Sequence, residues 1–264
     1  MSLRPAPAAM PQGTLLSFAE SLADAARPIA LSHFRTRLDV ESKADDSPVT
    51  IADRAIEARL RAMIEQRYPG HGILGEETGA TPGDGSLWVI DPIDGTKSFV
   101  TGIPLFGTLL AHLRHGVPIL GVVDIPVLGE RWTAEAEGPA LLNGAPVRAS
   151  DCRALASARF MTTSPEGFHG PDEAAYRRLS AAVGLRRFGG DCYAYALLAC
   201  GHCDLIAECG LQPYDYLALV PVIEGAGGVV TDWNGAPLGL DSDGRVLAAA
   251  TPELHDAAMA LLRG

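Results

Sequence analysis

An apolar segment in the first half of the chain leads directly into two aspartates, Asp91 and Asp94. Residues 87–90 are strongly apolar, Pro92 restricts the backbone between the two acids, and Gly95 permits a tight turn after them. Two carboxylates held this close repel each other unless a cation lies between them, and oxygen ligands suit Mg²⁺, Mn²⁺ or Ca²⁺. The segment predicts a metal site at the exposed end of a strand, where α/β proteins place their chemistry. The alternative is a turn with two solvated aspartates.

Two further acidic positions could complete such a site. Glu76 and Glu77 follow a short apolar strand after Gly75, and Asp215 precedes an apolar helix. Each position also has a purely structural explanation. The glutamates could be solvated at a strand end, and Asp215 could cap its helix, a common role for aspartate that does not prevent it from also facing a metal.

The elements that must position these acids follow from hydrophobic periodicity. Residues 14–37 predict a helix that Pro28 should kink or divide. A second helix over residues 51–68 begins with a capping box formed by Thr50 and Asp53. Strands are expected at 72–75, 87–90, 106–114, 117–125 and 131–134, and after residue 150 at 159–163, 204–208, 228–232 and 246–250. Further helices are expected at 171–183, 191–200, 215–225 and 251–262.

This order predicts an α/β protein whose first half is α+β and whose second half alternates strands and helices. We expect a flexible tail over residues 1–13, a metal-binding half over 14–150 and a substrate-selecting half over 151–264. Because no serine- or glycine-rich linker separates the halves, they are expected to share a packed interface.

Composition excludes several classes of function. The 264 residues include 21 lysines and arginines and 32 aspartates and glutamates, for a net charge of −11. A chain this acidic is a poor candidate for nucleic-acid binding and suits a metal ion or a cationic small molecule. We expect no membrane span, because no segment has about 18–20 uninterrupted apolar residues. The five cysteines and the absence of a secretion signal predict a cytoplasmic protein with reduced thiols.

Three blocks of the chain resemble the inositol monophosphatase family. They are residues 75–77, the Trp-Val-Ile-Asp-Pro-Ile-Asp-Gly-Thr block at 88–96, and Tyr214-Asp215 ahead of the glycine-rich segment 224–228. The resemblance implies a Mg²⁺-dependent phosphomonoesterase with a layered αβαβα sandwich, usually a homodimer. It implies two or three Mg²⁺ ions per site, with Mn²⁺ also possible. The implied metal ligands are Glu76, Asp91, the Ile93 carbonyl, Asp94 and Asp215.

The resemblance also implies how the site would work. Asp53 and Thr96 match the pair that orients the attacking water in the family, and Asp53 or Glu76 would accept its proton. The backbone N–H groups of Gly95 and Thr96 would hold the phosphate if they open a helix. One of the metal ions, between Asp91, Asp94 and Asp215, would bind the ester oxygen. Lys43 resembles the lysine of the family's mobile metal-binding loop.

The second half should select the organic part of the substrate. The turn Gly189-Gly190-Asp191 departs from the inositol pattern by adding a carboxylate, and Glu208 matches the acid that contacts substrate in family members. This turn looks like the histidinol-phosphatase branch. L-Histidinol phosphate carries an ammonium and an imidazole, which an acidic pocket suits better than it suits a neutral polyol. The alternative is that Asp191 only caps the following helix.

We therefore expect hydrolysis of the small phosphate monoester L-histidinol phosphate to L-histidinol and phosphate by metal-activated water, a step of histidine biosynthesis. The alternatives are an inositol-1-phosphate phosphatase and a broad-specificity phosphatase. A different class of function, a protein-binding partner of the transcription machinery, is known within the family and also stays open.

Overall fold

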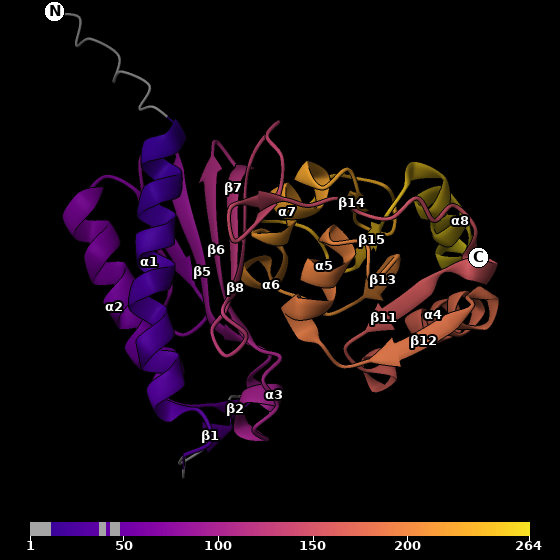
Figure 1. Cartoon of the computed structure of the whole chain (residues 1–264), viewed down its shortest axis with the longest axis horizontal. Helices are drawn as coiled ribbons and strands as arrows, with labels where there is room; N and C mark the ends of the chain where they lie inside the picture. Colours follow the sequence, from indigo (N-terminus) through magenta and orange to yellow (C-terminus); the bar gives the residue numbers. More distant parts are fainter. Residues whose placement is uncertain (1–11, 37–40, 43–47) are drawn as a thin grey trace, which may run out of the picture.

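The chain folds into five alternating layers of helix and sheet in the computed structural model, which describes residues 12–36, 41–42 and 48–264 (Figure 1). Helices α1 (Gln12–His33) and α2 (Ile51–Arg67) form the first layer and cover one face of an eight-stranded sheet. A middle layer of helices separates this sheet from a five-stranded sheet, and two helices cover the outer face of the latter. The middle helices are α5 (Asp191–Ala199), α6 (Pro213–Tyr216) and α7 (Leu219–Gly225), and the outer pair is α4 (Pro171–Ala182) and α8 (Pro252–Arg263). This is the αβαβα sandwich that the resemblance implies.

The eight-stranded sheet has the order β10-β9-β8-β7-β6-β5-β3-β4. Its strands are β3 (Gly72–Gly75), β4 (Gly79–Thr81), β5 (Ser86–Asp94), β6 (Gly107–Arg114), β7 (Val117–Ile125), β8 (Glu130–Glu135), β9 (Leu141–Leu142) and β10 (Ala145–Pro146). All neighbouring pairs are antiparallel except β3 and β5. Because β3 and β5 run in parallel, their carboxyl ends, which carry Glu76 and Asp91, reach the same edge of the sheet.

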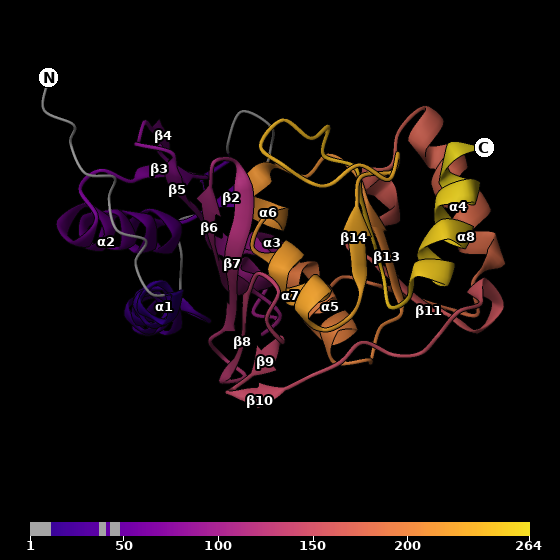
Figure 2. The same ribbon diagram turned by 90° about the horizontal axis from the view of Figure 1, so that it is seen from above.

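The five-stranded sheet has the order β12-β11-β13-β15-β14. Its strands are β11 (Arg159–Thr162), β12 (Leu185–Phe188), β13 (Leu205–Glu208), β14 (Val229–Thr231) and β15 (Val246–Ala249). Figure 2 shows the two sheets facing each other across the middle helices. Short elements complete the fold: β1 (Glu41–Ser42) paired with β2 (Pro48–Val49), α3 (Thr96–Val100), η1 (Leu155–Ser157) and η2 (Pro165–Gly167). Among the described helices, none is long and apolar enough to cross a membrane.

Strand β5 separates two hydrophobic cores. Trp88 and Ile90 are fully buried against α1 and α2, whereas Val89 packs in the core between the two sheets. Side chains alternate between the two faces of a strand, so Asp91 follows Val89 on the face toward the middle helices. The alternation that fills both cores therefore also directs the first metal-ligand candidate toward α6.

Pro28 was expected to kink or divide the first helix, and the division does not occur. Helix α1 continues through Pro28 as a single helix and ends at His33, before the predicted limit of 37, which lies outside the described residues. Proline removes one backbone hydrogen bond from a helix. Small buried residues on both sides of it, Ala26 and Ala30, keep the helix packed against the sheet and offset that loss.

Two other predicted bounds are corrected by the structure. The strand predicted at 87–90 extends through both aspartates to the end of β5, and the helix predicted at 215–225 is divided into α6 and α7. Several short elements without clear periodicity were not predicted: β1, β2, β4, α3, β9, β10, η1, η2 and β12. The capping box at Thr50 and Asp53 is confirmed, with both of its reciprocal hydrogen bonds present.

Candidate active site

A bulge at the end of β5 brings Asp91 and Asp94 to the same side of the sheet. Asp91 pairs with Leu109 and Asp94 with Gly107, so β5 has one residue more than β6 in this interval. Residues three apart on a regular strand would face opposite sides, and the extra residue cancels that alternation. The Thr108 hydroxyl donates a 2.8 Å hydrogen bond to the Pro92 carbonyl within the bulge. The candidate metal-binding motif is thus a distorted strand end rather than a turn after a strand.

Asp215 joins these two aspartates from α6. Carboxylate oxygens of Asp91, Asp94 and Asp215 lie within 4.8 Å of one another. Asp215 is the third residue of α6, and its Oδ2 accepts a 2.7 Å hydrogen bond from the Gln212 N–H. It therefore stabilises the start of its helix through a capping box, without being the N-cap residue itself, and also faces the other two acids.

This acidic cluster fits a divalent cation. Asp91 is 1 % exposed, and its Oδ1 has no hydrogen-bond partner among the described residues. Burial, together with the charges of neighbouring acids, raises the pKa values of Asp91 and Asp94 well above the ordinary aspartate value and that of Asp215 to about 7. Without a cation, these carboxylates oppose one another's ionisation, so a hard metal ion would stabilise the charged forms.

Glu76 lies beside the cluster, and Asp53 lies next to Glu76. The Glu76 N–H donates a 3.3 Å hydrogen bond to the Ile90 carbonyl, and the Glu76 charge is a main cause, after burial, of the raised pKa of Asp91. Asp53 accepts hydrogen bonds from the Thr50 N–H at 2.9 Å and the Thr50 hydroxyl at 2.5 Å. Burial and, more weakly, the Glu76 charge raise the pKa of Asp53. The electrostatic interactions therefore place Glu76 next to Asp91, and Asp53 next to Glu76.

Thr96 and Ile93 are in direct contact. The Thr96 hydroxyl donates a 3.0 Å hydrogen bond to the Ile93 carbonyl, the backbone group expected to bind metal. Gly95 precedes α3 with a positive φ of 82°, which glycine adopts without steric cost. A Cβ on Gly95 would lie 2.9 Å from Asp191 Oδ2, so the close approach of Asp191 also requires glycine here. Thr96 opens α3, the condition under which its N–H was expected to help hold the phosphate.

A pocket of about 570 Å³ opens next to the acidic cluster. Six of the residues expected to bind substrate line it: Asp94, Gly95, Thr96, Asp191, Glu208 and Asp215. The expected residues Gly189 and Gly190 lie instead in the turn between β12 and α5 that leads to Asp191, outside the pocket lining. The halves of the chain before and after residue 150 both contribute to this pocket.

Asp191 has an unusual backbone conformation. Its φ is 46°, a left-handed value that is uncommon for a residue other than glycine. The alternative that Asp191 caps α5 was wrong, because Gly190 is the N-cap residue and no side chain caps this helix. Asp191 Oδ2 instead accepts a 3.1 Å hydrogen bond from the Ser98 hydroxyl in α3. Its carboxylate is held against the first half of the chain, and burial raises its pKa.

Glu208 lies at the end of β13 with both carboxylate oxygens bonded. Its Oε1 accepts a hydrogen bond from the Thr163 N–H at 2.7 Å, and its Oε2 accepts one from the Tyr195 hydroxyl at 2.9 Å. Burial raises the pKa of Glu208 despite these hydrogen bonds. Glu208 therefore fixes the pocket wall and adds acidic character to it.

The sequence analysis missed other parts of the pocket wall. Lys97, Thr163, Phe168, His169 and Leu211 line the pocket. Of these, Lys97 adjoins the aspartate motif and Leu211 begins the segment that ends at Tyr214-Asp215, whereas His169 had no metal-ligand spacing to single it out. Lys43, which resembles the loop lysine of the family, lies outside the described residues.

Residues 12–264 match the sequence profile of the Inositol monophosphatase family. The chain belongs to the inositol monophosphatase family. Members of this family are metal-dependent phosphoric monoester hydrolases, so the acidic cluster and the adjoining pocket have the chemistry that membership requires.

The chain is similar to family members that are named for different activities. The chain is 46% identical to the bifunctional phosphatase IMPL2 of Arabidopsis thaliana, with 90% of this chain and 72% of the relative covered. It is 38% identical to a histidinol-phosphatase of Chlorobaculum parvum, with 88% and 91% covered. A solved structure of an inositol monophosphatase from Zymomonas mobilis superposes with a TM-score of 0.89 at 41% identity, with 97% and 100% covered.

Proposed function

We propose that this protein is a Mg²⁺-dependent phosphatase that hydrolyses L-histidinol phosphate to L-histidinol and phosphate. The observation that carries the choice of substrate is Asp191. Its strained backbone and its hydrogen bond to Ser98 hold a carboxylate at the wall of the pocket. A backbone outlier next to a site of chemistry is a reason to look for a function there.

The charge of the pocket supports a cationic substrate. Besides the acidic cluster, the pocket is lined by three further acids, Glu166, Asp191 and Glu208. Lys97 adds one positive charge to the pocket lining. The ammonium and imidazole of L-histidinol phosphate complement these carboxylates, whereas a polyol has no charge to pair with them. The similarity to a histidinol-phosphatase agrees with this choice. The similarity to the Zymomonas protein supports the second candidate, inositol-1-phosphate hydrolysis.

The residues of the chain divide the chemistry between them. Glu76, Asp91, the Ile93 carbonyl, Asp94 and Asp215 would hold the metal ions. When bound, Mg²⁺ neutralises phosphate oxygens, acidifies an attacking water and stabilises the leaving alkoxide. Thr96 would orient the water, with Asp53 or Glu76 accepting its proton.

The Thr96 hydroxyl has a single proton to donate. In the structure the hydroxyl donates that proton in a hydrogen bond to the Ile93 carbonyl. A carbonyl oxygen has two lone pairs, so it could accept this hydrogen bond and also be a metal ligand, and the Thr96 hydroxyl oxygen could still accept a hydrogen bond from the water. We propose that it orients the water in this way, while the N–H groups of Gly95 and Thr96 hold the phosphate. The same proposal includes two or three metal ions per site, with Mn²⁺ able to replace Mg²⁺. It also includes a homodimeric assembly, a cytoplasmic location and a place in histidine biosynthesis.

Replacing Asp191 tests the choice of substrate. Asp191→Ala should raise KM for L-histidinol phosphate far more than KM for inositol 1-phosphate, because only L-histidinol phosphate carries cationic groups that can pair with the Asp191 carboxylate. Asp256→Ala, the same substitution at an exposed aspartate of α8, is the matched control and should change neither value. Equal effects of Asp191→Ala on both substrates would contradict the role of Asp191 in selectivity.

A further inference from the structure

The carboxylate of Glu57 accepts hydrogen bonds from the turn that follows Glu76. Glu57 is on α2, one helical turn after Asp53, and its side chain is 0 % exposed. Its Oε2 accepts a 2.7 Å hydrogen bond from the Glu77 N–H. Its Oε1 accepts hydrogen bonds from the N–H of Thr78, at 3.1 Å, and from the Thr78 hydroxyl. The two residues that follow Glu76 are thus bonded to one buried carboxylate.

Arg61 holds the same turn from its other end. Its Nε donates a 2.8 Å hydrogen bond to Glu57 Oε1, which balances the buried charge. The same guanidinium donates to the Thr81 hydroxyl at 3.1 Å and to the Gly79 carbonyl. Glu57 and Arg61, at i and i+4 on one helix face, therefore bind the chain from the end of β3 into β4.

The close approach of Glu57 depends on the residue before Glu76. A Cβ on Gly75 would lie 2.4 Å from the Glu57 carboxyl carbon, a distance that requires one of the two to move. On the other side, the Glu76 N–H is bonded to Ile90 of β5. The backbone on both sides of Glu76 is consequently fixed, by α2 from one direction and by β5 from the other.

We propose that Glu57 is a positioning residue that holds the Glu76 carboxylate in place for Mg²⁺. The inference rests on the proposed function, because it takes Glu76 as a metal ligand. Outer partners that orient a ligand strengthen metal binding, since the ligand does not have to be ordered when the ion arrives. Glu57 therefore acts on metal affinity through the turn and does not touch substrate.

Glu57→Gln tests this proposal with little change of shape. The glutamine amide nitrogen cannot accept a hydrogen bond, so one of the turn N–H groups loses its partner. We expect the Kd for Mg²⁺, measured by calorimetry without substrate, to rise about 10–100-fold. The kcat at saturating Mg²⁺ should change far less, which distinguishes positioning from a general loss of structure. The control is Glu65→Gln, the same substitution at an exposed position of α2, and it should leave the Kd unchanged.

Two milder variants cover the case in which Glu57→Gln fails to fold. Thr78→Val at the exposed turn removes only the hydroxyl donor, and Gly75→Ala displaces the carboxylate. Both should weaken Mg²⁺ binding, Thr78→Val less than Glu57→Gln. Wild-type Mg²⁺ affinity in a folded Glu57→Gln, or in both milder variants, would overturn the inference. If the wild-type protein itself binds no Mg²⁺, the metal site of the proposed function is wrong, and the inference with it.

Discussion

Asp94 Oδ2 accepts a 2.5 Å hydrogen bond from the backbone N–H of Cys192, the second residue of α5. This contact joins a metal-ligand candidate of the first half to a helix of the second half. The partial positive charge at the helix N-terminus favours the ionised carboxylate. Burial and the nearby charges of Asp191 and Asp215 act against it and raise the pKa of Asp94. A bound cation would favour the ionised form of Asp94.

Asp94→Asn is expected to separate catalysis from stability. The amide oxygen can still accept the Cys192 N–H, while the negative charge for the metal is lost. Phosphate release should fall at least a thousandfold, about 4 kcal/mol of barrier. In the absence of Mg²⁺ the Tm should stay nearly unchanged, because the lost charge lies among other acids. Full phosphatase activity in this variant would rule out Asp94 as a ligand.

Removing divalent metal should lower the stability of the wild-type protein. A ligand that binds only the folded state at 100 times its Kd contributes about 2.7 kcal/mol. For a chain of this size that corresponds to a rise in Tm of about 5–10 °C when Mg²⁺ is added after chelation. Calorimetric scans of wild type and Asp94→Asn should show this rise only in the wild type. An equal rise in both proteins would place the stabilising ion elsewhere.

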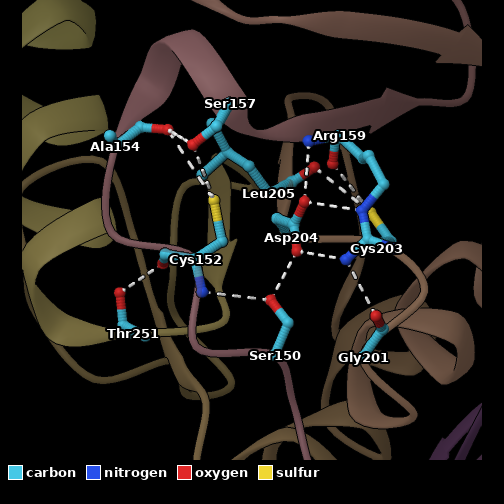
Figure 3. Close-up of polar contacts among 10 residues, drawn as sticks. All are labelled: Ser150, Cys152, Ala154, Ser157, Arg159, Gly201, Cys203, Asp204, Leu205 and Thr251. Atoms are coloured by element: carbon cyan, nitrogen blue, oxygen red, sulfur yellow. Dashed lines mark hydrogen bonds and ion pairs between the residues drawn. The ribbon is translucent and has the colours of Figure 1, made fainter.

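Stability should also depend on pH through Asp204, which precedes β13 and the pocket acid Glu208. Figure 3 shows Asp204 between Arg159 and Ser150; Arg159 donates to it from Nε at 2.8 Å and from Nη2 at 2.6 Å. Burial alone would raise the pKa of Asp204, but the hydrogen bonds outweigh it and lower the pKa. The ionised form is thus favoured in the folded state, and its contribution is lost as the pH falls through the lowered pKa.

Asp204→Asn should therefore destabilise the protein near neutral pH by about 1–3 kcal/mol. The difference from wild type should begin to shrink as the pH falls below the ordinary aspartate pKa of about 3.9. It should be gone once the pH is below the lowered pKa of Asp204 in the folded state. Urea titrations at several pH values measure it, with Asp256→Asn as the exposed control. A difference that stays constant down to the acid limit would mean that the ionised carboxylate is not what stabilises this contact.

Much of the fold was predictable because local signals and tertiary packing agree. The alternation of Trp88, Val89 and Ile90 requires a strand between two cores, and Thr50 with Asp53 begins α2 as predicted. The helix does not divide at Pro28, because the packing of α1 on both sides of this residue outweighs the loss of one backbone hydrogen bond.

The site was less predictable where it depends on contacts distant in sequence. The bulge at Pro92 and Ile93 exists only relative to β6, so the sequence suggested a turn instead. The hydrogen bond between Asp191 and Ser98 crosses 93 positions, and capping was the simpler local explanation for that aspartate. The pocket residue His169 had no motif at all, because its place comes from the packing of the loop that follows β11.

The central claim is a phosphatase for L-histidinol phosphate, and a substrate panel tests it most directly. The measurement is Mg²⁺-dependent phosphate release from L-histidinol phosphate, inositol 1-phosphate, fructose 1,6-bisphosphate and 3′-phosphoadenosine 5′-phosphate. Because a charged group in a matching pocket is worth several kcal/mol, we predict that kcat/KM for L-histidinol phosphate exceeds the others by about a hundredfold or more. Activity led by inositol 1-phosphate, or spread evenly over the panel, would contradict the role we give to the acidic pocket around Asp191.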